Sequence, residues 1–266
     1  MNKKAIFFDI DGTVFEHDIQ DLPKSTYIAL KILKEKGVKL CACTSRVSAE
    51  LSNLSGEFIR MCDGFIHSAG AVIEIDGLKY KTSFLDKDDV RAILKYCKEN
   101  KIVARWAADD CDSCHFDSFM DDKITDIWRY LYNMEPTYKP WDGRMIVHID
   151  TFPPMYKADE IRKLVNNTNV VVLKETIEFI EKDASKGNAI KEVMKHWSVD
   201  FSDAIAVGDG KNDIEMFRNV ELSIAMGQSQ DEVKNAASYV TDRIEEDGFY
   251  LALVKLGIID DVLSML

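Results

Sequence analysis

The chain lacks a long apolar run, a cysteine framework and internal repeats. No apolar stretch approaches the roughly 18 residues that a membrane-spanning helix needs, and the run Ala5–Phe8 is too short for the core of a signal peptide. The six cysteines follow no regular spacing, and a chain of 266 residues can bury a core without disulfides. We therefore expect a cytoplasmic protein with reduced thiols and no membrane partner.

Basic residues are also in deficit, because 34 Lys and Arg stand against 46 Asp and Glu, a net charge of −12. Binding to nucleic acids or anionic membranes requires a basic face, so the excess of acid argues against both partners. The content of apolar residues, 46%, is ordinary for a globular protein. A chain of this length is expected to form one large domain or two modest ones.

Short, nearly continuous apolar runs end abruptly in small or polar residues, as the buried strands of a parallel sheet do. These runs are Ala5–Phe8, Val38–Cys43, Gly64–Ile66, Ala204–Val207, Leu222–Ala225 and Tyr239–Thr241. Helical patterns lie between them, at Lys24–Lys36, Asn188–Trp197 and Asp213–Arg218. The alternation predicts an α/β fold whose core is a doubly wound, Rossmann-like parallel sheet.

The middle of the chain has a mixed pattern of helices, short strands and acidic loops. The helix candidates are Lys87–Asn100 and Tyr156–Asn166, and the strand candidates are Ile102–Trp106, Met145–Ile149, Val170–Leu173 and Thr176–Ile180. The last two strands flank Lys174-Glu175, which predicts a hairpin. We predict an inserted α+β cap domain at residues 83–182, with residues 1–82 and 183–266 as the two parts of the core domain.

Two carboxylates follow the first predicted strand. Asp9 and Asp11 are two residues apart, so on an extended chain their side chains point the same way. Two negative charges at so short a distance repel each other, so a proton or a cation is required between them. An isolated Asp11-Gly12 pair fits a simple turn equally well, but the segment Gly208–Asp213 brings further carboxylates to the same sheet edge. Hard oxygen ligands of this kind suit Mg²⁺.

Two further positions suit an anionic ligand. Thr44 ends a predicted strand and offers a hydroxyl, and Lys186 follows the insert, where a lysine can act as a point charge on phosphate. Each alone is more often a structural or surface residue. Ligands of doubly wound sheets bind at the carboxyl ends of the strands, where Asp9, Thr44 and Asp209 all fall. Their joint occurrence therefore indicates a phosphate site.

Together these segments resemble the four motifs of the haloacid dehalogenase superfamily. The matching residues are Asp9-x-Asp11-Gly12-Thr13, Thr44-x-Arg46, Lys186 and Gly208-Asp209-x-x-Asn212-Asp213. The insert and the closing Glu246-Asp247-Gly248-Phe249 are similar to the Cof-like phosphatase branch, whose type IIB members carry an α/β cap. The resemblance implies a Mg²⁺-dependent phosphatase that hydrolyses a small phosphorylated metabolite, with a sugar phosphate as one candidate, through an aspartyl-phosphate.

The resemblance also implies roles for the motif residues. Asp9 would be the nucleophile and Asp11 the general acid and base. Mg²⁺ would be held by the carboxylates of Asp9 and Asp209 and the backbone carbonyl of Asp11, with Asp213 orienting the waters of the metal. The residues implied to bind phosphate or substrate are Gly12, Thr44, Ser45, Arg46, Lys186 and Asn212.

The chain departs from the branch pattern at two places. Ser45 stands where the branch usually has Gly, and it keeps the backbone N–H, so phosphate binding is expected to persist. Ala69-Gly70 replaces the usual Asn-Gly and removes a side-chain amide that could contact the substrate. The second departure means that the identity of the substrate cannot be taken from the branch, whereas the expected phosphatase chemistry is unaffected.

Other readings of the sequence remain open. Cys111-x-x-Cys114-His115 has the spacing of a haem attachment motif, although an acidic cap loop with free thiols is the simpler interpretation. Arg105 and Trp106 could face a substrate, but packing in a core or at a surface is more common for such residues. A phosphotransferase or phosphomutase could use the same intermediate, and a non-catalytic protein that binds phosphorylated ligands could use the same fold. The oligomeric state is not determined by the sequence.

Overall fold

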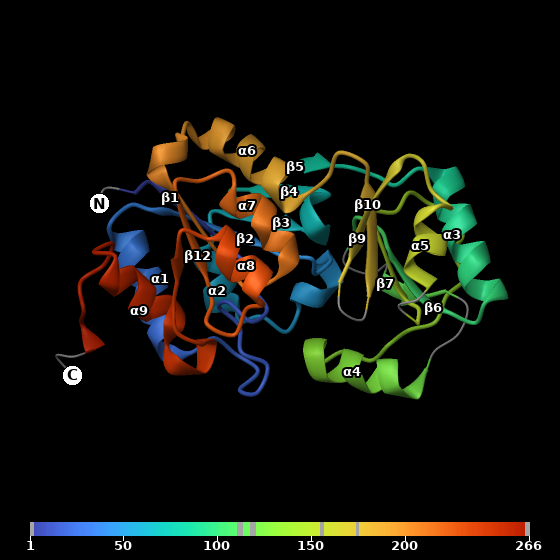
Figure 1. The fold of residues 1–266 in the computed structure, drawn as a ribbon, viewed down its shortest axis with the longest axis horizontal. Coiled ribbons are helices and arrows are strands. Elements are labelled where there is room, and N and C mark those ends of the chain that lie inside the picture. The colour runs from blue at the N-terminus through green and yellow to red at the C-terminus, as the bar shows by residue number, and fades with distance from the viewer. Residues whose placement is uncertain (1–2, 111–113, 118–120, 155–156, 174–175, 264–266) are drawn as a thin grey trace.

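The computed structural model describes residues 3–110, 114–117, 121–154, 157–173 and 176–263. These residues form two sheets that lie side by side, the larger at the left of Figure 1 and the smaller at the right. The larger sheet, from edge to edge, consists of β13 (Tyr239–Val240), β12 (Leu222–Ala225), β11 (Ala204–Gly208), β1 (Ala5–Phe8), β2 (Lys39–Cys43), β3 (Gly64–His67), β4 (Val72–Ile75) and β5 (Leu78–Thr82). Neighbouring strands from β13 to β3 are parallel, and β4 and β5 are antiparallel additions.

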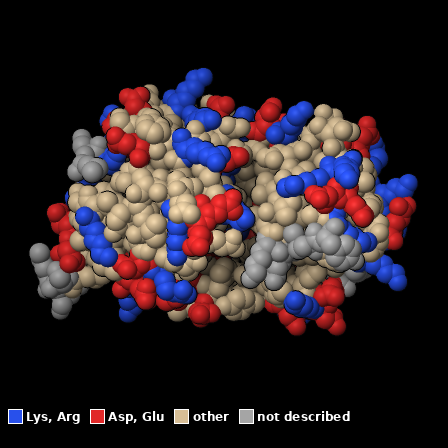
Figure 2. Space-filling model, in the orientation of Figure 1, with Lys and Arg blue, Asp and Glu red and all other residues tan. Residues whose placement is uncertain are grey.

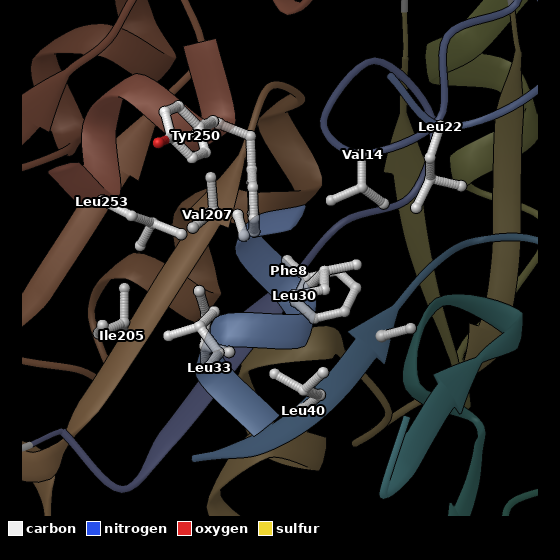
Figure 3. Packing of buried hydrophobic residues seen from close by; sticks show 14 of the residues in the cluster. Phe8, Val14, Leu22, Leu30, Leu33, Leu40, Ile205, Val207, Tyr250 and Leu253 are labelled. Carbon is white, nitrogen blue, oxygen red and sulfur yellow. The ribbon is translucent and has the colours of Figure 1, made fainter. Parts of the chain in front are cut away.

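Helices cover both faces of the larger sheet. One face packs against α1 (Lys24–Glu35), α2 (Gly56–Met61) and α9 (Gly248–Lys255), and the other against α6 (Lys186–Trp197), α7 (Ile214–Phe217) and α8 (Asp231–Ala236). Alternate residues of β1 serve the two faces: Phe8 packs with Leu30 and Leu253 on the first face (Figure 3), and Phe7 packs on the second. The predicted α/β class is therefore confirmed.

The smaller sheet is antiparallel throughout. Its strands, in order, are β7 (Cys114–Phe116), β6 (Val103–Ala107), β8 (His148–Phe152), β10 (Ile177–Glu181) and β9 (Thr168–Val172). One face packs against α3 (Lys87–Glu99) and α5 (Ala158–Arg162) at the far right of Figure 1, while α4 (Asp122–Tyr132) runs below the sheet in that view. The other face of this sheet is turned toward the larger sheet.

Most predicted core elements agree with the structure to within two residues, and β1 and β12 agree at both ends. In the insert, the helix predicted at Lys87–Asn100 is confirmed, but the strand predicted at Met145–Ile149 is wrong at its start, because β8 begins at His148. Helix α4 was not predicted; its first turn is capped by the Asp121 carboxylate accepting the Ile124 N–H.

The smaller sheet falls within residues 83–182, the range predicted for the cap, and the exact domain boundaries stay a prediction. The predicted hairpin turn at Lys174-Glu175 and the start of the helix predicted at Tyr156 lie outside the described residues. Among the described residues, no helix has both the length and the apolar character that crossing a bilayer requires. On the face shown in Figure 2, basic and acidic side chains are interspersed.

Candidate active site

Parallel pairing of β1 with β11 brings two acidic residues to one edge of the larger sheet. The backbone N–H of Asp9 donates to the Val207 carbonyl at 2.9 Å, so Asp9 follows β1 at the level where Asp209 follows β11. Asp9, Asp209 and Asp213 offer carboxylate oxygens that all lie within 4.8 Å of one another. Asp9 is 7% exposed and Asp213 is fully buried. The predicted acidic cluster is therefore assembled from two distant segments.

Lys186 lies between two of these carboxylates. Its Nζ is 2.6 Å from Asp9 Oδ1 and 2.8 Å from Asp213 Oδ1, and the residue is 2% exposed. It begins α6, where the Ser185 hydroxyl accepts the Asn188 N–H at 3.1 Å and caps the helix. Burial alone would lower the pKa of Lys186, but the two carboxylates outweigh it and raise that pKa, so the side chain is an ammonium ion.

One ammonium ion does not balance three carboxylates, of which those of Asp9 and Asp213 are buried and that of Asp209 is partly exposed. Burial raises the pKa of Asp9 well above its ordinary value, although Lys186 opposes the shift. Burial also raises the pKa of Asp209 to about 7, and repulsion from Asp213 adds to it. A divalent cation among these oxygens would supply the missing positive charge. The all-oxygen donor set fits Mg²⁺ better than the softer transition metals.

Asp213 supports the site through the backbone. Its Oδ2 accepts the N–H groups of Asp209 at 3.0 Å and Gly210 at 2.9 Å, and its Oδ1 accepts from Lys186. Both oxygens are therefore committed to the loop after β11 and to the lysine. This arrangement suits a residue that orients the site rather than one that binds a ligand with both oxygens.

Gly12 lies so close to Asp209 that a side chain would collide with it. Its φ is +75°, and a Cβ would lie 2.6 Å from Asp209 Oδ2. Gly77 has nearly the same φ, +74°, but a Cβ there would have no neighbour within 4 Å. Both positions favour glycine because of their left-handed backbone, and only Gly12 also requires it for space.

We expect Gly12→Ala to lower the free energy of unfolding by about 1–3 kcal/mol more than Gly77→Ala does, because only Gly12→Ala forces a steric overlap. The two variants share the backbone penalty, so urea denaturation of both isolates the contact with Asp209. Equal losses of stability would contradict the close approach.

Asp11 is clamped by two basic side chains. Arg46 donates from Nε to Oδ2 at 2.9 Å and from Nη2 to Oδ1 at 2.6 Å, and His17 Nε2 lies 2.9 Å from Oδ1. Burial would raise the pKa of Asp11, but the hydrogen bonds from Arg46 and His17 outweigh it and hold that pKa well below its ordinary range. Asp11 is therefore ionised in this arrangement.

Arg46 is itself fully engaged. The side chain is buried, and its Nη1 donates to Asn53 Oδ1 at 2.6 Å and to the Glu50 carbonyl at 3.1 Å. Its guanidinium lies 4.8 Å from the centre of the Phe15 ring. The sequence predicted Arg46 as a substrate contact, whereas the structure brings it to Asp11.

The loops after β2 and β11 are linked by side-chain hydrogen bonds. Thr44 is buried and its hydroxyl accepts the Arg46 N–H at 3.0 Å. The Ser45 hydroxyl accepts from the Asn212 amide at 3.0 Å. Thr44, Ser45 and Asn212 thus lie at the sheet edge that also carries the carboxylates.

A cavity of about 630 Å³ lies between this edge and the smaller sheet. Ser45 lines it from the larger sheet, while the smaller sheet contributes Arg105, Asp150 and Glu178. Helix α4 supplies apolar and aromatic walls, including Trp128. The cavity is large enough for a small metabolite, and its walls come mostly from the smaller sheet and α4, with Ser45 at the edge of the larger sheet.

Arg105 lines this cavity, which is the alternative considered less common from the sequence, and its charge is used within the protein. Its Nη1 is 2.5 Å from Glu50 Oε1, its Nη2 contacts Asp150, and the guanidinium lies 4.6 Å from the Trp128 ring centre. Trp106 is fully buried on the opposite face of the strand, and its Nε1 donates to the Lys139 carbonyl. Trp106 is therefore a core residue.

The haem-like motif gives no site among the described residues. Cys111 lies outside the described part of the chain. Cys114 contacts the Arg105 guanidinium at 3.2 Å, and His115 Nδ1 lies 2.7 Å from the Thr137 hydroxyl. The described members of the motif thus face different partners.

The charged or titratable residues at the site or cavity that were not predicted from the sequence include His17, Glu50, Asp150 and Glu178. Asp150 and Glu178 each interrupt a short apolar strand with a charge, which is a signal that could have been used. His17 and Glu50 belong to no recognised motif, and only the fold brings them to Asp11 and Arg105.

Comparisons with known proteins agree with this geometry. A family model described as haloacid dehalogenase-like hydrolase matches residues 6–253. "Putative phosphatase YkrA" of Bacillus subtilis (strain 168) is 26% identical over 97% of this chain and 100% of its own length. The 5-amino-6-(5-phospho-D-ribitylamino)uracil phosphatase YcsE of the same strain is 24% identical over 94% of both chains. The solved structure of the HAD subclass IIB sugar phosphatase BT4131 superposes with a TM-score of 0.87, at 26% identity, over 96% of this chain and 100% of that one.

Proposed function

Because the chain belongs to the haloacid dehalogenase-like hydrolases, in the Cof-like branch with a subclass IIB cap, we propose that it is a Mg²⁺-dependent phosphatase of a small phosphorylated metabolite. The observation that carries the proposal is Lys186 bridging Asp9 and Asp213 beside Asp209. A buried nucleophile, a buried ammonium ion and an acidic cluster at one strand end suit phosphoryl transfer. A reduced-thiol cytoplasmic setting is part of the same proposal.

Asp9 is the proposed nucleophile. One of its oxygens attacks phosphorus, the bond to the leaving oxygen breaks, and an aspartyl-phosphate forms; water then attacks phosphorus and releases Asp9 and inorganic phosphate. Lys186 fixes the orientation of the Asp9 carboxylate through its 2.6 Å contact. Mg²⁺, held by Asp9, Asp209 and the Asp11 carbonyl, would reduce the repulsion between the carboxylate and the phosphate.

Asp11 is the proposed proton carrier. In the first step it gives a proton to the leaving oxygen, and in the second it takes one from the attacking water. The ionised form held by Arg46 and His17 suits the second step. The first step requires that this clamp loosen while the leaving group is bound, so Arg46 positions Asp11 rather than the phosphate.

The phosphoryl oxygens are proposed to be bound by Thr44, Ser45, Asn212 and Lys186. Ser45 and Asn212 are linked across the two loops, and the Thr44 hydroxyl accepts the Arg46 N–H within its own loop, which fixes these groups before a ligand arrives. Gly12 allows the backbone to approach the anion and Asp209 closely. The position of the smaller sheet over the cavity favours a small substrate rather than a phosphoprotein.

Removal of metal tests this proposal. We expect release of inorganic phosphate from p-nitrophenyl phosphate to be lost on treatment with EDTA and to return on addition of Mg²⁺.

Asp209→Asn is expected to raise the Mg²⁺ concentration required for half-maximal rate by about tenfold or more, because it removes a charged ligand. The matched change Asp200→Asn, at an exposed position, should leave that concentration unchanged. Full activity in EDTA would contradict the metal requirement.

A further inference from the structure

Three charged residues form a row across the face of the smaller sheet that lines the cavity. Arg105 of β6 pairs in register with Asp150 of β8, and Asp150 pairs with Glu178 of β10. Residues directly opposite on neighbouring strands lie on the same face, so all three side chains turn toward the cavity. The intervening positions, such as Trp106 and Phe179, pack into the core on the other face.

This row carries an excess of negative charge. The Arg105 guanidinium contacts both Glu50 and Asp150, so its charge is already balanced. His148 adds no positive charge, because burial lowers its pKa to about 3, and it lies 3.0 Å from Asp150 Oδ1 as a neutral ring. Arg105 therefore faces three carboxylates, those of Glu50, Asp150 and Glu178.

Glu178 is the member of the row for which the described residues supply no ion pair, although its carboxylate lies near the Ser45 hydroxyl. It is 4% exposed, it lines the cavity, and its Oε2 has no hydrogen-bond partner among the described residues. Burial raises the pKa of Glu178, and the nearby Ser45 hydroxyl and Lys186 charge oppose that shift. A buried carboxylate oxygen without a donor is costly, so the site is complete only when a ligand supplies one.

The position of Glu178 indicates which end of a ligand it would meet. Glu178 lines the same cavity as Ser45, which is proposed to bind a phosphoryl oxygen, so the carboxylate faces the phosphate end. The cavity extends from there past Arg105 to the Trp128 wall. A leaving group attached to the bound phosphate would therefore extend along the acidic row.

Two other occupants fit less well. His148, Asp150 and Glu178 could gather around a metal ion, but His148 Nε2 and Asp150 Oδ1 already contact each other, and Asp150 Oδ2 contacts Arg105. A second anionic group on the substrate would meet the unbalanced carboxylates. A protonated amine satisfies the charge and the missing donor together.

We propose that Glu178, with Asp150 beside it, binds a protonated amine of the leaving group, so that the preferred substrate is a phosphate monoester of an amino sugar or amino alcohol. This inference rests on the proposed function, because it takes the phosphate to lie at Asp9. In this inference, the row formed by Arg105, Asp150 and Glu178 selects a substrate whose leaving group is cationic over one whose leaving group is neutral or anionic.

The test compares three substrates of one carbon skeleton: glucosamine 6-phosphate, glucose 6-phosphate and 6-phosphogluconate, at pH 6.5. We expect kcat/KM to be about tenfold or more higher for the amine than for the neutral sugar, and lowest for the acid. Glu178→Gln should bring the ratio of the first two toward one, while Glu99→Gln, the same change at an exposed position of α3, should keep it. Equal kcat/KM for the amine and the neutral sugar, or an equal loss for all three substrates in Glu178→Gln, would overturn the proposal.

Binding separates this inference from the proposed function. Failure of the proposed function would appear as no phosphate release from any of the three substrates. Calorimetric titration of the same three compounds into the Asp9→Asn variant then tests whether Glu178 binds the amine. We expect the amine to bind more tightly than the other two compounds. Equal affinities would overturn it, and so would Zn²⁺ binding that is lost in Glu178→Gln, because the row would then be a metal site.

Discussion

Asp9→Asn is expected to lower kcat for p-nitrophenyl phosphate by about 10⁴-fold or more, because an amide nitrogen or oxygen cannot form the aspartyl-phosphate. The folded state should tolerate the change. Asn removes a buried charge whose ionised form is disfavoured by burial, and Lys186 keeps its second partner, Asp213. Steady-state assays of phosphate release, together with thermal unfolding, measure both expectations.

The matched control is Asp260→Asn, the same chemical change at an exposed residue near the end of the described chain. It should retain the activity of the unaltered protein. An Asp9→Asn protein that is folded and turns over aryl phosphate within about tenfold of the unaltered rate would exclude Asp9 as the nucleophile.

Lys186→Met is expected to lower the free energy of unfolding by about 3–5 kcal/mol, in addition to abolishing turnover. Removing one member of a buried ionic cluster leaves its partners desolvated and unpaired. Here both Asp9 and Asp213 would lose their contact with the ammonium ion. Urea denaturation without added divalent metal measures the loss.

Lys191→Met is the corresponding control, because Lys191 is exposed on the same helix. Substitution there should change stability by less than about 0.5 kcal/mol, as at ordinary surface positions. A similarly small effect for Lys186→Met would show that the lysine does not hold the cluster together.

The sequence was most informative about features that depend on residues close together in the chain. Buried parallel strands are continuously apolar, so β1 and β12 could be delimited from their composition alone. The rule that parallel strands place their carboxyl ends at one edge then gathered Asp9, Thr44 and Asp209 without any knowledge of contacts. The four motifs added Lys186, which no periodicity would have singled out.

The insert was harder because its pairing is not local. Arg105, Asp150 and Glu178 come from three strands that are far apart in the chain, and only the sheet register sets them in a row. Side-chain partners posed the same difficulty: Arg46 was assigned to substrate because no pattern reveals its bidentate contact with Asp11.

Helix α4 is a different case, because its signals were present and were not used. Asp121 is a favourable N-cap, and Ile124 and Trp128 are four residues apart on one face. No helix was predicted over these residues, and the insert was described only as containing acidic loops between its predicted elements. The consequence for function is substantial, since α4 forms a wall of the cavity.

The central claim is that phosphate passes through Asp9, and rapid quenching tests it most directly. Protein mixed with phosphorus-labelled substrate and Mg²⁺ would be quenched in acid within milliseconds and digested, and the label located by mass spectrometry. We predict label on the peptide that contains Asp9, at a level that depends on Mg²⁺, and none in the Asp9→Asn variant. Rapid release of phosphate with no label on Asp9, or with label on another residue, would contradict the account.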